Sequence, residues 1–209
     1  MPRNFCKAMS SDLDKFRNKY SLRERDFLLF PYGSRIYGTV SPRSDSDFNA
    51  VIPDRFGIAT GEFFHHNKTN VQIYTRTDWQ DQLNQHKIHC LEAYYLPDGV
   101  CKNEFSFELS LQQLRSALSE KSSHSFVKAK KKIDKEKDYY IGWKSLFHSL
   151  RILVFGTRIA TSGQIDYDEA NHYWEEIAGN PQYTWDFYKD KYQPIYNQLS
   201  TEFKKAAPK

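Results

Sequence analysis

The feature that most constrains this chain is a Gly-Ser turn between two short apolar segments, the second of which begins with closely spaced aspartates. Residues 27–30 form an apolar run that predicts a buried strand, ended by Pro31 and Gly33. Residues 47–52 alternate between apolar and other positions, which predicts a second strand. A chain that turns at Gly33 and Ser34 and then returns in this way is expected to build a small sheet with a polar turn at one end.

The rest of the pattern predicts one more strand and then helices. Residues 71–74 favour a third strand, and helices are expected over the region of residues 13–20 and over residues 78–86. From residue 106 onward the apolar period becomes helical. Residues 125–159 predict one long helix or two in series with a weak point at Gly142. Further helices are predicted at 166–177 and at 183–204, the last broken near Pro194.

The predicted fold class is therefore α/β in its broad sense (α+β), a small mixed sheet core followed by a helical bundle. The boundary is placed so that residues 1–105 form the core and residues 106–209 the helical domain. A chain of 209 residues can bury a sizeable core without covalent staples.

Composition narrows the environment in which the chain is expected to act. Cys6, Cys90 and Cys101 lie far apart, which is typical neither of a disulfide framework nor of a zinc site. The N-terminus has no secretory apolar segment, and no window approaches the roughly 20 apolar residues of a membrane span. A cytoplasmic protein without a membrane partner is expected. The net charge of +4 permits a polyanionic partner without requiring one.

The spacing of Asp45 and Asp47 predicts a metal site. Residues two apart on a strand project from the same face, so the two carboxylates repel each other unless a divalent cation lies between them. Oxygen ligands of this kind suit Mg²⁺. Gly33 lets the backbone approach a phosphate, Ser34 adds a hydroxyl donor, and a helix beginning after Ser34 would add free N–H groups.

These residues also carry a resemblance to a known family. Residues 33–39 read Gly-Ser-Arg-Ile-Tyr-Gly-Thr, and residues 44–48 read Ser-Asp-Ser-Asp-Phe. The run resembles the signature of the DNA-polymerase-β-type nucleotidyltransferase superfamily, and it is most similar to its branch of bacterial and phage predicted nucleotidyltransferases. The resemblance covers residues 27–52, with a looser extension through the third strand into the helical region, and it favours a bacterial or phage origin.

The resemblance implies an activity and a set of roles. The expected reaction moves a nucleoside monophosphate from an NTP, ATP foremost, to a hydroxyl group with release of pyrophosphate. Gly33 and Ser34 would bind the triphosphate, and Asp45 and Asp47 would hold Mg²⁺ or Mn²⁺.

The chain departs from the family at the third acidic position. The family usually places a carboxylate on the next strand, facing the aspartate pair, and the matching residue is taken as Gln72. An amide cannot accept a proton in its place. Three explanations stay open: catalysis is lost and nucleotide binding kept, this copy is an engineered inactive form, or an acid comes from elsewhere, with Glu92, Asp54 and Asp78 as candidates.

Basic residues supply the remaining candidates for nucleotide binding. Arg35 and Arg43 lie in and after the Gly-Ser turn. Lys144, His148 and Arg151 are spaced four and three apart, so they line one side of a predicted helix. They could lean over the nucleotide, in keeping with a Lys…His…Arg pattern that the same branch carries, or they could form a solvated helix flank. The adjacent His65 and His66 are interpreted as structural or surface residues.

The acceptor is left open by the sequence. The lysine-rich stretch 128–137 could follow a nucleic-acid backbone while Phe126, Tyr139 and Tyr140 stack on bases, or it could be a solvated helix face. RNA, tRNA especially, is slightly favoured over a small molecule or a protein hydroxyl. The rival hypothesis is a catalytically reduced nucleotide-binding or partner-binding module, similar to an antitoxin on this fold. The oligomeric state is not predicted.

Overall fold

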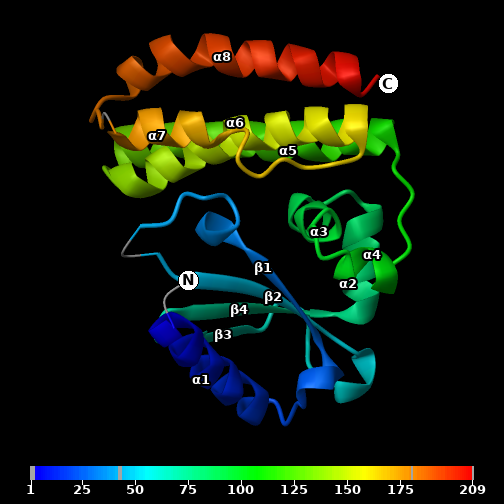
Figure 1. Cartoon of the computed structure of the whole chain (residues 1–209). Coiled ribbons are helices and arrows are strands. Elements are labelled where there is room, and N and C mark those ends of the chain that lie inside the picture. Colours follow the sequence, from blue (N-terminus) through cyan, green and yellow to red (C-terminus); the bar gives the residue numbers. More distant parts are fainter. Residues whose placement is uncertain (1–2, 42–43, 180, 209) are drawn as a thin grey trace.

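The computed structural model describes residues 3–41, 44–179 and 181–208, with side chains from residue 11 onward. Its elements form two layers, a small sheet with its own helices and a layer of long helices above it (Figure 1). The predicted mixed α+β class, a sheet core followed by helices, is confirmed.

The sheet has four strands in the order β1-β2-β4-β3, where β1 is Leu28–Tyr32, β2 Ser46–Ile52, β3 Phe63–His66 and β4 Thr69–Thr75. β2 is antiparallel to β1 and parallel to β4, and β3 closes the other edge antiparallel to β4. The three predicted strands are confirmed in position. β3 was not predicted, because four residues offer too short an alternation to detect.

One face of the sheet packs on α1 (Arg3–Lys19). Phe16 of this helix is fully buried against the apolar side chains of β2 and β4, among them Phe48 and Val71. The other face carries α2 (Arg76–Asn84), α3 (Ile88–Tyr94) and α4 (Val100–Glu104), through which it meets the long helices (Figure 1). Of these three helices only α2 was predicted. This second face carries the site.

The helical layer contains α5 (Leu111–Lys130), α6 (Tyr139–Ser162), α7 (Asn171–Gly179) and α8 (Trp185–Ala206). The predicted 125–159 segment forms two helices in series, joined by a π-helical turn, Lys131–Lys135, and by Lys137 at a positive φ of 56°. The break therefore falls before Gly142. That glycine lies inside α6, where an added Cβ would come within 2.4 Å of Ile133 Cγ1.

Two further boundaries differ from prediction. α7 begins at Asn171, because Asp168 N–H donates to Asp166 Oδ1 in a turn that precedes it. α8 continues through Pro194, where a break was predicted. The buried rings of Tyr188 and Tyr192 pack on the neighbouring helices just before the proline, so tertiary packing outweighs the hydrogen bond that the proline removes.

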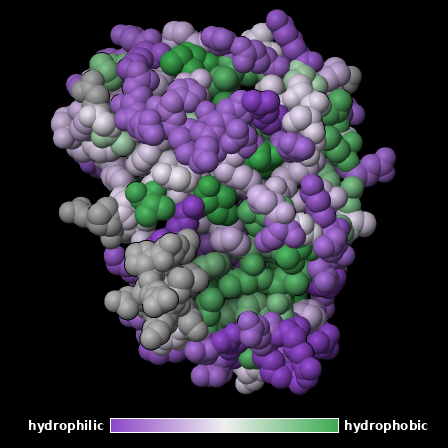
Figure 2. Space-filling view, in the orientation of Figure 1, coloured by the Kyte–Doolittle hydropathy of each residue, from purple (hydrophilic) through white to green (hydrophobic). Residues whose placement is uncertain are grey.

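The two halves of the chain share a core. One buried cluster joins Phe30 and Trp79 from before residue 105 to Leu118, Ile152 and Phe203 from after it. The division near residue 105 thus separates elements of different kind that are packed on a common interior. In Figure 2 the helical layer presents a mostly hydrophilic surface, whereas apolar surface gathers over the sheet half. Within the described residues, no helix is both long and apolar enough to span a membrane.

A candidate nucleotide site between the sheet and helix α6

A cavity of about 180 Å³ opens between the sheet and α6. We call the side of the cavity formed by Gly33, Ser34 and Asp47 its floor. Its roof consists of Lys144, His148 and Arg151 on α6. Tyr37, Thr39, Phe147 and Trp174 complete the lining. Residues more than a hundred positions apart in the sequence, each expected from the sequence to contact nucleotide, therefore meet around one cavity.

The floor depends on a close approach of backbone to carboxylate. Gly33 follows β1 at a φ of 79°, a conformation that costs little only for glycine, and it starts the short 3-10 turn Gly33–Arg35. A Cβ at this position would lie 2.8 Å from Asp47 Oδ2. The turn is too short to act as the helix that the sequence predicted after Ser34. Its backbone and the Ser34 hydroxyl remain as candidate groups for binding a phosphate.

Asp45 and Asp47 are bridged by a residue that the sequence reasoning missed. The Nδ2 group of Asn70 on β4 donates to Asp47 Oδ1 at 2.8 Å and to Asp45 Oδ2 at 3.3 Å. Its Oδ1 lies 2.7 Å from Nδ1 of His65 on β3. A donor thus occupies the position between the two carboxylates where a shared cation would lie.

The observed strand register places a different amide, two residues before Gln72, opposite the aspartates. Asp47 pairs with Asn70 across the parallel strands, whereas Gln72 pairs with Asn49 and donates to the Glu62 carbonyl at 3.3 Å. Asn70 therefore stands where Gln72 was predicted, opposite the carboxylate pair. Because Asn70, Gln72 and Tyr74 alternate on one face, the sequence did show a polar face. It could not show which member lies opposite Asp47.

The three candidate replacement acids are engaged elsewhere. Glu92 is buried beneath α6, and Tyr37 Oη donates to its Oε2 at 2.7 Å. Asp54 accepts from Thr77 N–H, and Asp78 accepts from Gln82 Nε2. None of the three is among the residues that line the cavity.

A buried ion pair fixes the roof. Arg151 is fully buried, with Nη1 3.1 Å from Glu92 Oε1, and its guanidinium lies over the Tyr37 ring at 3.4 Å from the centroid. The Nη1–Oε1 contact is electrostatic rather than a well-aligned hydrogen bond. Burial raises the pKa of Tyr37 far above its ordinary value, against the lowering effect of Arg151, so its hydroxyl stays a donor. Arg151 therefore acts mainly to hold α6 on α3 and on the turn after β1.

The arginine also fixes the protonation of His148. Arg151 Nη2 lies 2.6 Å from His148 Nδ1, and a guanidinium can only donate, so Nδ1 accepts and the ring proton is on Nε2. Burial, followed by the charge of Arg151, lowers the pKa of His148 well below 6.5. His148 is thus a neutral N–H donor near neutral pH. Lys144 adds the cation of the roof, with Nζ 4.9 Å from the Tyr140 ring centroid.

Of the two remaining arginine candidates, the structure describes only Arg35, which is not among the residues that line the cavity. Arg35 Nε donates to the Asp45 carbonyl at 3.1 Å and its Nη2 reaches the Ser44 carbonyl, so it positions the loop that leads into β2. Arg43 lies outside the described residues.

The two carboxylates could hold one hard cation if a bound ligand supplied further oxygen atoms. In the described part of the chain, no group of three or more His, Cys, Asp or Glu side chains converges on a metal position. Two carboxylates that share one amide donor could instead share Mg²⁺, provided that phosphate oxygens complete its coordination. Comparison with models of protein families and with curated proteins finds no match to this chain.

Proposed function

We propose that this protein is a metal-dependent nucleotidyltransferase that moves a nucleoside monophosphate from an NTP to a hydroxyl group. One observation carries the proposal: the Gly33-Ser34 turn and Asp47 line one small cavity together with Lys144 and His148. Anion-binding backbone, a metal-binding carboxylate and opposing cationic or N–H donors are the groups that phosphoryl transfer requires.

In this proposal each group has a role toward the nucleotide. Asp45 and Asp47 would hold Mg²⁺ or Mn²⁺, which supplies charge neutralisation at the phosphates. The backbone at Gly33 and the Ser34 hydroxyl bind phosphate oxygens, while Lys144 and the Nε2–H of His148 contact them from the roof. The acceptor oxygen bonds to the α-phosphorus as the bond to pyrophosphate breaks, and the hydroxyl proton passes to solvent. Catalysis is thus mainly positioning and charge stabilisation.

A second candidate is a nucleotide-binding module without transfer. Asn70 favours it, because an amide stands at the position of a third carboxylate and cannot take the proton of an acceptor. The same cavity would then bind NTP, and the readout would pass to a partner protein.

The test compares NTP binding with transfer in the same preparations. Each α-labelled NTP is offered with Mg²⁺ or Mn²⁺ and with total RNA and a cell extract as acceptors. The chain is run beside Asp47→Asn and beside Asp54→Asn, a matched loss of charge in a turn outside the cavity. Label transfer that Asp47→Asn abolishes and Asp54→Asn keeps supports the enzyme. NTP binding without transfer in any form supports the module, and absence of NTP binding contradicts both.

A further inference from the structure

The cavity continues into a groove along the boundary between the two layers. It shares Lys144 and His148 with an adjoining hollow of about 510 Å³. That hollow shares Lys121 and His124 with a third, of about 280 Å³, which reaches α3. We call the three together the basic groove, and its lysines are Lys87, Lys121, Lys128 and Lys144.

The lysines of the groove are not neutralised by the protein. In the described part of the chain, no carboxylate forms an ion pair with any of the four. Of the described residues, Glu120 is the one acid that lines the hollows of about 510 Å³ and 280 Å³. By contrast, Lys131 and Lys132, three and four residues after Lys128, are paired with Glu136. The lysine-rich stretch 128–137 is therefore divided, because Lys128 faces the groove while its neighbours pair internally.

Two histidines report a positive potential in the groove. The pKa of His89 is lowered to about 4, mainly by burial and then by the charges of Lys121 and Lys87. Lys121 and Lys128 also contribute to the lowered pKa of His148. The charge of Lys121 thus contributes to the lowered pKa of a histidine at each end of the groove.

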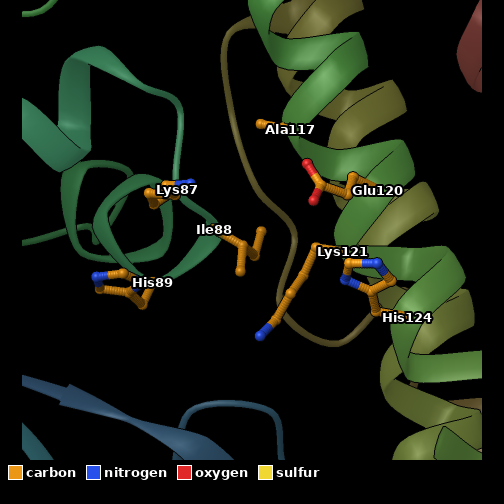
Figure 3. Close-up of a pocket in the computed structure, with 7 residues that line it drawn as sticks. All are labelled: Lys87, Ile88, His89, Ala117, Glu120, Lys121 and His124. Atoms are coloured by element: carbon orange, nitrogen blue, oxygen red, sulfur yellow. The ribbon is translucent and has the colours of Figure 1, made fainter.

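The length and shape of the groove suit a chain of phosphates. The α5 residues that line it run from Ala117 to Lys128, which corresponds to about 16 Å of helix at 1.5 Å per residue. A stacked strand advances by about 3.4 Å along its axis per nucleotide, so more than one phosphate can lie along this length. In Figure 3 Lys121 extends from α5 into the space between α5 and α3, and Ile88 faces this space from α3, whereas the ring of His89 points away from α5.

We propose that the basic groove binds a single-stranded nucleic acid whose terminal hydroxyl enters the cavity beside Asp47. The lysines would follow the phosphodiester backbone, and the flat side chains of Tyr32 and His124 would contact bases. Phe126, a sequence candidate for stacking, is buried against Trp185 and Tyr196 and is excluded from this role. The inference rests on the proposed function only for the direction of the strand.

Strand binding is measured without NTP or metal, so it is independent of transfer. Fluorescence anisotropy with a labelled mixed-sequence 12-mer, as RNA and as DNA, is followed over a range of NaCl concentrations. The test variant is Lys121→Ala/Lys128→Ala, and the control is Lys204→Ala/Lys205→Ala, an equal charge loss on exposed residues of α8. We expect the groove variant to bind at least about tenfold more weakly, with a salt slope lower by about 1.4, and the control to bind like the parent.

Several outcomes separate this inference from the proposed function. Parent-like strand binding by the groove variant, or equal weakening in the control, would contradict the proposal that the basic groove binds the strand. Loss of NTP binding together with strand binding in the groove variant would overturn it as well, because the groove would then belong to the nucleotide. Asp47→Asn is expected to keep strand binding while it loses transfer. If the alanine pair unfolds, Lys121→Gln/Lys128→Gln is measured instead, and the RNA and DNA arms identify which strand is preferred.

Discussion

The floor and the roof of the cavity are built in different ways. Gly33 of the floor directly follows β1, and Asp47 lies only fourteen positions later on the antiparallel strand β2, so the backbone itself brings them together. The roof residues lie on α6 and are held over the floor by Arg151, whose partners Glu92 and Tyr37 come from distant parts of the chain. The floor therefore depends on local geometry, and the roof depends on one buried ion pair.

This difference indicates how the site is expected to fail. A change in the floor should alter ligand binding while most of the fold persists. A change at the ion pair should loosen the contact between the two layers, because the core beside it is shared by both halves of the chain.

The largest effect is expected from Glu92→Ala. The variant leaves Arg151 buried without its carboxylate, which typically costs about 3–5 kcal/mol of the free energy of unfolding. Urea denaturation measures this loss, and NTP binding should weaken with it.

The matched control for that variant breaks the ion pair of another arginine on α6, Arg158. Glu169→Ala removes the partner of Arg158, whose ion pair with Glu169 is solvent-exposed, and should leave unfolding nearly unchanged. Equal losses in the two variants would mean that the roof does not depend on the buried pair.

Gly33→Ala tests the floor with a smaller expected effect on stability. The methyl group forces a side chain into positive φ and places Cβ 2.8 Å from Asp47 Oδ2, so about 1–3 kcal/mol should be lost. NTP binding in the presence of Mg²⁺ should be abolished, whereas the protein should remain folded. Gly57→Ala, at a positive φ with no atom within 4 Å of the added Cβ, isolates the backbone strain. Retained NTP binding in Gly33→Ala would contradict the role given to the turn.

Asn70→Asp tests the register of the floor. A third carboxylate opposite Asp47 should strengthen Mn²⁺ binding on the order of tenfold, since metal affinity follows ligand charge. Titration calorimetry with Mn²⁺ alone gives the readout, independent of any transfer. Gln72→Glu is the control, and a gain in that variant instead would show that the acid position had been assigned correctly from the sequence.

Acid should lower the stability of the fold in a graded way, through His148 of the roof and His89 of α3. The folded-state pKa of His148 lies well below 6.5 and that of His89 at about 4, so the unfolded chain takes up protons first. Stability from these groups is complete above about pH 6.5 and should fall by up to about 1.4 kcal/mol per pH unit per histidine as pH drops toward 4. Urea midpoints across this range should flatten in His148→Gln. An unchanged slope would mean that His148 is protonated in the folded protein.

The local structure of this protein follows largely from patterns among neighbouring residues. Apolar runs and their period predicted three of four strands and most helices, because these signals need only neighbouring residues. The Gly-Ser turn and the aspartates two apart predicted a pair of carboxylates on one face beside a tight turn, and both lie there. Short elements such as β3, α3 and α4 were missed because too few residues carry a period.

The strand register and the partners of the site residues depend instead on long-range contacts. The register of the parallel strands placed Asn70, not Gln72, opposite Asp47, because parallel strands joined by a long connection have no turn to fix their alignment in advance. Packing of α6 on α3 turned Glu92 from a possible catalytic acid into the partner of Arg151. The same packing placed Lys121 and Lys128 along a groove with Lys144. Such contacts join residues far apart in sequence, and a pattern of neighbours does not contain them.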